Sequence, residues 1–177
     1  GVLEGSGDMM KLLVVVDVQN DFVDGALGTK EAVEIIPYVR EKVENFLGEV
    51  VYTMDTHDEN YLLTQEGNKL PVKHCLKGSQ GWQLREGIYR ENSKIFEKIG
   101  FGSTDLVDYI SVLGKTVESV EFVGICTDIC VVSNAILLKA HFPELPIIVD
   151  SKGCAGVTPQ THKNAIETMK MCQIEVI

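Results

Sequence analysis

Residues 12–16 read Leu-Leu-Val-Val-Val and lead directly into Asp17. The run is rich in β-branched residues and does not alternate with polar ones, which is typical of a central parallel strand covered on both faces. Other short apolar runs follow and alternate with helical patterns. Strands are expected at 12–16, 50–53, 95–97, 119–123, 146–150 and 174–177, and helices from Ile36-Pro37, at 104–113, at about 127–141 and from Thr158-Pro159 to about Met171. The alternation predicts a three-layer α/β/α fold with a six-stranded, mostly parallel, Rossmann-like sheet.

The composition bounds the class of protein. The chain has 177 residues, of which 45% are hydrophobic and 24% charged, and this suits one globular domain with a sizeable core. The formal net charge is −10. Phosphate binding needs clustered positive charge, so we expect no nucleic-acid partner and no anionic membrane partner. The chain also has no apolar run near the roughly 18 residues that span a bilayer.

The first eight residues differ in character from the rest. Residues 1–8 are small and polar and have no basic region typical of a secretion signal. We expect them to be a vector-derived remnant or a disordered arm, and residues 9–177 to form a single domain. A cytoplasmic location is therefore expected, in which the five cysteines are reduced thiols.

Three reactive side chains follow predicted strands. Asp17 follows the first strand, Lys98 follows the third, and Cys130 lies in the first turn of the helix after the fourth. Sites in parallel sheets form at this end of the strands. A helix N-terminus and a nearby lysine would both lower the pKa of a thiol, and Asp17 could carry its proton to a leaving amine. One alternative is that Cys130 is a small buried apolar residue. Cys126 is the competing candidate, although it lies in the turn itself, where we expect its backbone to matter more than its sulfur.

A second group of side chains has the composition of a metal site. Asp55 and His57 are separated by one residue, His74 follows seventeen residues later, and Glu66 lies in the same loop. Imidazole and carboxylate ligands suit zinc, manganese or iron. The alternative is a solvated loop with unrelated polar groups.

Taken together, these motifs resemble the isochorismatase-like cysteine hydrolases, and within them the nicotinamidases most. The resemblance rests on Asp-Val-Gln-Asn-Asp-Phe at 17–22, Asp-Thr-His at 55–57, Lys98, and Gly-x-x-Thr-Asp-x-Cys-Val at 124–131. It covers the chain from about residue 11 to 177, with the motifs in the family's order.

The resemblance implies a catalytic triad of Asp17, Lys98 and Cys130. It also implies a cis peptide bond between Ile125 and Cys126, and an oxyanion hole made by the backbone N–H groups of Cys126 and Cys130. A homo-oligomer is implied as well, because members of this family often form dimers or tetramers.

The metal site carries over from the resemblance too. Asp55, His57 and His74 would bind a divalent metal, which we expect to be zinc, with manganese or iron as alternatives, and Glu66 would be the fourth ligand. Isochorismatases proper lack the Asp-x-His pair, so its presence favours an amidase over a vinyl-ether hydrolase.

The implied reaction is hydrolysis of a small carboxamide through a thioester, with nicotinamide converted to nicotinate and ammonia. Phe22 and Trp82 are expected to stack on the flat ring. Two runs depart from those common in nicotinamidases, Lys-Ile-Gly-Phe-Gly-Ser at 98–103 and Leu-Pro-Val-Lys-His at 70–74. The departures concern the pocket wall, and so they leave the identity of the amide open.

Three alternatives follow from the same residues. One is a hydrolase of the same family that acts on an N-carbamoyl or ureido compound or an isochorismate-like ether. The second is a non-catalytic, flavodoxin-like binding module. The third is a thiol redox protein that uses Cys126 and Cys130, although their spacing fits the usual C-x-x-C motif poorly.

Overall fold

The computed structural model describes residues 9–177, and the segment expected to be a remnant or arm lies outside them. Its sheet has six strands in the order β3-β2-β1-β4-β5-β6, and every neighbouring pair is parallel. The strands are β1 (Met10–Val16), β2 (Glu49–Asp55), β3 (Ile95–Lys98), β4 (Val117–Ile125), β5 (Ile147–Ala155) and β6 (Glu175–Val176). The predicted six-stranded parallel sheet is confirmed.

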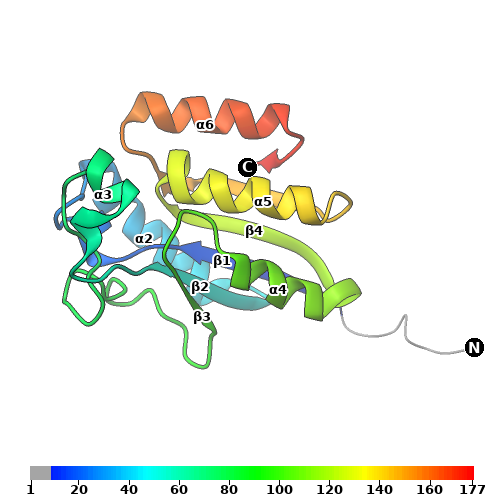
Figure 1. Cartoon of the computed structure of the whole chain (residues 1–177). Coiled ribbons are helices and arrows are strands. Elements are labelled where there is room, and N and C mark those ends of the chain that lie inside the picture. The colour runs from blue at the N-terminus through cyan, green and yellow to red at the C-terminus, as the bar shows by residue number, and fades with distance from the viewer. Residues whose placement is uncertain (1–8) are drawn as a thin grey trace, which may run out of the picture.

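Helices cover both faces of the sheet (Figure 1). They are α1 (Asn20–Val23), α2 (Lys30–Asn45), α3 (Gln65–Lys69), α4 (Thr104–Leu113), α5 (Val132–His141) and α6 (Pro159–Met171), with short helices η2 (Tyr61–Leu63), η3 (Gly114–Thr116) and the π-helical turn η4 (Thr127–Val131). In the first strand, Leu12 and Val14 pack with α4, α5 and α6, whereas Leu13 and Val15 pack with α2. The central strand is therefore buried on both faces, as its sequence predicts.

The start of α2 differs from the sequence expectation. We expected Pro37 to open this helix, and that expectation is wrong: the helix begins at Lys30, and Pro37 lies inside it. The side chain of Thr29 caps the helix by accepting the backbone N–H of Ala32. Capping and the burial of one apolar face against the sheet offset the hydrogen bond that proline cannot donate.

The helices on the opposite face follow the sequence more closely. The helix α4 has the predicted bounds, and α6 begins at Pro159 after the capping residue Thr158, as predicted. The helix expected to begin near Thr127 is present, but its first turn is the π-helical turn η4. None of the helices in residues 9–177 is both long and apolar enough to span a bilayer.

The strand order also fixes where a site can form. The chain leaves β1 toward β2 on one side, and β4 pairs with β1 on the other. Connections therefore diverge at the carboxyl ends of β1 and β4, which is where crevices open in parallel sheets. Asp17, Lys98 and the turn that carries Cys130 all lie at this edge.

Candidate active site

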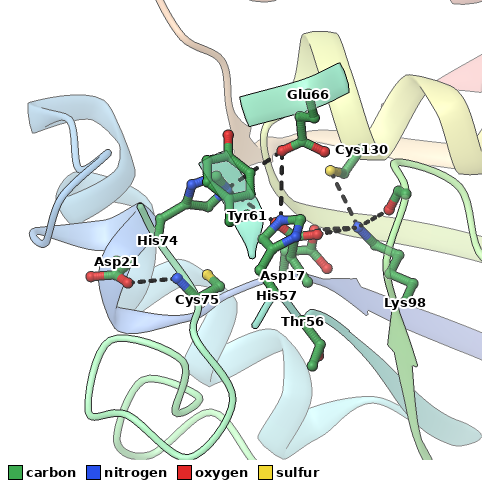
Figure 2. A network of polar contacts seen from close by, with 12 residues as sticks. Asp17, Asp21, Thr56, His57, Tyr61, Glu66, His74, Cys75, Lys98 and Cys130 are labelled. Carbon is green, nitrogen blue, oxygen red and sulfur yellow. Dashed lines mark hydrogen bonds and ion pairs between the residues drawn. The ribbon is translucent and has the colours of Figure 1, made fainter. Parts of the chain in front are cut away.

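The structure brings the three predicted catalytic residues together (Figure 2). The Lys98 Nζ atom lies 2.7 Å from Asp17 Oδ2 and 3.4 Å from Cys130 Sγ. All three residues are 5% exposed or less. An acid, an ammonium group and a thiol therefore share one buried site.

Asp17 presents one carboxylate oxygen to Thr53 and the other to Lys98. Its backbone has a positive φ of 49°, and its N–H donates to the carbonyl of Thr53. The Thr53 hydroxyl donates to Oδ1 at 2.7 Å, whereas Oδ2 faces Lys98 and accepts no aligned hydrogen bond from the described residues. Burial raises the pKa of Asp17, although Lys98 opposes the shift. Asp17 is thus a stronger base than an ordinary carboxylate.

The Cys130 thiol differs from the sequence expectation in its acidity. We expected a lowered pKa, but burial raises the pKa of this thiol well above its ordinary value, and the Asp17 charge raises it further while Lys98 lowers it. Desolvation of the thiolate outweighs the attraction of the Lys98 ammonium group. Burial therefore favours the protonated thiol, whose proton must leave when the sulfur reacts.

Lys98 keeps its charge in this site. Burial alone would lower its pKa, but the negative groups around it, Asp17 first among them, hold the pKa above the ordinary value. The Nζ atom also donates to the carbonyl of Gly100 at 3.0 Å and lies 3.8 Å from Asp55 Oδ1. One ammonium group thus links the triad to the neighbouring cluster of ligands.

The turn that carries the nucleophile candidate has an unusual backbone. The peptide bond between Ile125 and Cys126 is cis, as the resemblance implies. The carbonyl of Cys126 accepts the N–H groups of both Ile129 and Val131, at 3.1 and 3.0 Å. These bonds close the π-helical turn η4, in which Cys130 lies.

The four predicted metal ligands also converge. One ligand atom from each of Asp55, His57, Glu66 and His74 lies within 4.8 Å of the others. Figure 2 shows His57, Glu66 and His74 facing one another. The Nε2 atoms of the two histidines lie 2.9 and 3.3 Å from Asp55 Oδ2, and 3.5 and 3.7 Å from Glu66 Oε2. Two imidazoles and two carboxylates at this spacing fit a small divalent cation such as zinc.

The surroundings orient these ligands. His74 Nδ1 lies 2.8 Å from the carbonyl of Val72, so its Nε2 atom is left to face the cluster, as is usual for metal-binding histidines. The ring of Tyr61 packs against both His57 and His74. Although burial opposes ionisation of Asp55, hydrogen bonds from the histidines and the Lys98 charge lower its pKa to about 2. A carboxylate that stays ionised is what a cation requires.

A cavity of about 190 Å³ joins the two groups. Its lining includes Cys130 together with three of the four candidate ligands. The lining residues are Phe22, Leu27, Thr29, Asp55, Glu66, Leu70, His74, Phe101, Cys126, Ile129, Cys130 and Val157. The walls are mainly apolar, and no lysine or arginine is among them.

The two expected ring contacts have different outcomes. Phe22 lines the cavity, and its ring lies edge-on to His74 at 5.4 Å. Trp82 does not line the cavity, so the expectation that it contacts the ring is not supported. Its indole N–H donates instead to the hydroxyl of Thr56 at 3.0 Å, and the ring packs against the core cluster that includes residues of β1, β2 and α2.

Sequence reasoning missed several residues that support the site. Gln19 is fully buried and binds the backbone of Asp55 twice, donating to its carbonyl and accepting its N–H, each at 2.9 Å. Its place in the motif at 17–22 could have indicated this supporting role. Thr53, whose hydroxyl donates to Asp17, is an ordinary strand residue, and nothing in the sequence indicated its role. The wall residues Leu27 and Val157 come from connections whose sequences carry no motif.

Comparison with known proteins agrees with this geometry. The family model of the isochorismatase domain matches residues 11–177. The chain belongs to the isochorismatase family. As a member of this family it shares the α/β fold of the solved relatives, and it is a hydrolase.

Several relatives of this isochorismatase-family chain have names that state an activity. It is 28% identical to the nicotinamidase/pyrazinamidase of Mycobacterium tuberculosis, over 95% of this chain and 98% of the relative. It is 25% identical to a nicotinamidase of Schizosaccharomyces pombe, over 93% of this chain and 91% of the relative. The crystal structure of a Pyrococcus horikoshii pyrazinamidase in complex with zinc has a TM-score of 0.84 and 27% identity, covering 95% of this chain and 98% of that one.

Proposed function

We propose that the chain hydrolyses a small neutral carboxamide through a thioester on Cys130, and that nicotinamide is its substrate. The observation that carries the proposal is the position of one ammonium group, Lys98 Nζ, 2.7 Å from the Asp17 carboxylate and 3.4 Å from the Cys130 sulfur. The nicotinamidase relatives support a hydrolase of the carbon–nitrogen bonds of linear amides.

Asp17 and Lys98 would divide the first step between them. As the sulfur attacks the amide carbon, Asp17 Oδ2 takes the thiol proton and Lys98 stabilises the sulfur's negative charge. The carbonyl electrons move onto its oxygen, which the backbone N–H groups of Cys126 and Cys130 would bind. Loss of one such donor typically costs about 10²–10³-fold in rate.

The same carboxyl group would complete the reaction. Asp17 gives its proton to the amide nitrogen, the carbon–nitrogen bond breaks, and ammonia leaves a thioester on Cys130. Asp17 then takes a proton from water as the water oxygen attacks the thioester carbon. The carbon–sulfur bond breaks, the sulfur is protonated again, and the acid is released.

The cluster beside the triad fits a divalent metal, which would be held by Asp55, His57, Glu66 and His74. When bound, the metal would supply a Lewis-acid centre for the pyridine nitrogen or for water. Zinc is the proposed ion, because the donor set suits it and the Pyrococcus horikoshii pyrazinamidase was solved in complex with zinc.

The charge of the cavity favours a neutral amide over the other substrates of the family. Ureido acids and isochorismate-like ethers carry carboxylates, and no lysine or arginine lines the cavity to bind one. The carboxylates of Asp55 and Glu66 line it instead. A carboxylate-bearing substrate would be repelled by these groups, whereas a flat, uncharged ring between apolar walls would not.

A panel of substrates tests this assignment. The metal-loaded chain is given nicotinamide, an N-carbamoyl amino acid, a ureido acid and acetamide, and ammonia release is followed for each. We expect nicotinamide to have the highest kcat/KM, with nicotinate as the second product. Preference for a carboxylate-bearing substrate, or no ammonia from nicotinamide, would contradict the proposal.

A further inference from the structure

The buried amide side chain of Asn134 has no part in the chemistry described above. Asn134 lies in α5 and is 1% exposed. Its helix neighbours Val131, Ala135 and Leu138 are buried apolar residues of the core. Asparagine is a poor helix former, and a buried amide is costly unless its polar atoms are bonded. The partners of this side chain therefore indicate why an amide lies here.

Asn134 joins the nucleophile turn to the loop that follows β3. Its Nδ2 atom donates to the carbonyl of Cys130 at 2.8 Å and to the carbonyl of Phe101 at 3.2 Å. Its Oδ1 atom accepts the N–H of Ser103 at 2.8 Å. Cys130 and Phe101 both line the cavity, so one carboxamide connects the attacking residue to the wall that faces it.

The loop has few other restraints. Lys98 Nζ holds its first part through the carbonyl of Gly100, and Ser103 caps α4 by accepting the N–H of Leu106. The side chain of Phe101 between them is 47% exposed, so packing fixes it only in part. Its position relative to Cys130 depends on the backbone bonds that Asn134 makes.

We propose that Asn134 is a positioning residue that sets the preference for ring amides, by holding the Phe101 wall at a fixed position from Cys130. This inference rests on the proposed amidase function. A planar ring would contact the Phe101 wall, whereas a small aliphatic amide such as acetamide is too short to reach it. Loss of the Asn134 bonds should therefore harm nicotinamide turnover more than acetamide turnover.

Two variants and a matched control test the proposal. Asn134→Ala removes all three hydrogen bonds. Asn134→Ser keeps a hydroxyl that can bond the Cys130 carbonyl four residues earlier, but it cannot reach Phe101 or Ser103. Asn45→Ala is the control, because Asn45 Nδ2 makes the same kind of helix bond, to the carbonyl of Glu41 at 2.9 Å, on an exposed part of α2.

The readout is the ratio of kcat/KM for nicotinamide to kcat/KM for acetamide. This ratio is independent of the fraction of active protein, so a general loss of stability does not change it. We expect it to fall about 10-fold in both Asn134 variants, since about two hydrogen bonds to the wall are lost, and to stay unchanged in Asn45→Ala. A ratio within about 2-fold of wild type, or failure of both Asn134 variants to fold, would overturn the proposal.

A double-mutant cycle tests whether the effect passes through the wall. Phe101→Ala should lower the ratio by itself, and Asn134→Ser added to it should change the ratio by less than about 2-fold. Independent, multiplying losses would show that Asn134 does not act through Phe101.

Alkylation distinguishes failure of this inference from failure of the proposed function. If the wild-type chain hydrolyses neither amide, the rate constants for alkylation of Cys130 by iodoacetamide and by N-phenyliodoacetamide are compared. The ratio of the two should change about 5-fold or more in Asn134→Ser and remain constant in Asn45→Ala. An unchanged ratio would refute the positioning role whatever the substrate is.

Discussion

The charges of Asp17, Lys98 and Cys130 depend on one another. Burial raises the pKa of the carboxyl and of the thiol, and only the ammonium group of Lys98 opposes both shifts. These shifts favour a neutral thiol beside an ion pair over a preformed thiolate. The sequence placed these residues at one edge of the sheet, but it could not predict the acidity, because acidity depends on how much water the fold excludes.

Removing Lys98 should harm both stability and activity. Lys98→Met leaves the fully buried carboxylate of Asp17 without its partner, and breaking such a pair typically costs about 3–5 kcal/mol. We expect a loss of that order in the free energy of unfolding measured with urea. We also expect kcat to fall by at least about 100-fold.

The double variant Asp17→Asn with Lys98→Met is the control for this charge effect. It carries no unpaired charge, so it should be more stable than Lys98→Met alone while remaining inactive. Equal stability of the two variants would show that the buried ion pair does not explain the loss.

At the scale of elements, the sequence indicated most strands and helices but missed some of their ends. The capping pair Thr158-Pro159 located α6, whereas Pro37 misplaced the start of α2, because proline is compatible with both the first turn and a packed helix interior. The π-helical turn η4 was not predictable from apolar periodicity, since its form follows from the bonds to the Cys126 carbonyl.

The contact between η4 and α6 should make stability depend on pH. Thr127 Oγ1 lies 2.7 Å from His162 Nδ1, and burial lowers the pKa of His162. A lowered folded-state pKa means that this contribution is fully present above the unfolded value of about 6.5 and is lost as the pH falls through the folded-state value.

His162→Gln removes this titration. We expect the wild type to lose more unfolding free energy than His162→Gln between pH 7.5 and pH 5 when both are measured by urea denaturation. An identical pH dependence of the two proteins would contradict the role assigned to His162.

A buried charge network attaches α2 to the sheet. Lys42 Nζ lies 2.6 Å from Asp150 Oδ2 and also pairs with Glu121, and Tyr38 donates to Asp150 at 2.7 Å. Lys42→Met leaves two largely buried carboxylates unpaired, so it should lower the unfolding free energy by about 3 kcal/mol. The kcat/KM for nicotinamide of the folded protein should be unchanged, and a parallel loss of activity would show that this network also supports the site.

At the scale of the whole molecule, the parallel sheet and its edge could be predicted from alternating apolar runs, and the cluster of candidate metal ligands from the resemblance to the family. The position of Trp82 could not be predicted. The chain between β2 and β3 folds through η2 and α3 before it returns, and this path turns the indole toward Thr56 and the core instead of the cavity. Oligomeric state stays a prediction, as does a cytoplasmic location.

The metal cluster should contribute to the stability of the whole fold. A cation that binds only the folded chain raises the unfolding temperature, so chelation should lower the Tm. We expect about one zinc ion per chain by elemental analysis, less than half of this in His74→Ala, and the normal content in His141→Ala, whose histidine lies in α5 outside the cluster. A normal zinc content in His74→Ala would contradict the assigned ligands.

The most direct test of the central claim is the rate of ammonia release from nicotinamide by Cys130→Ala. Cys172→Ala serves as the control, because Cys172 is an exposed thiol outside the cavity. Loss of a catalytic nucleophile should lower kcat by at least about 10⁴-fold, with an unchanged circular-dichroism spectrum, while Cys172→Ala keeps the wild-type rate. Ammonia release by folded Cys130→Ala within about 10-fold of wild type would contradict the account.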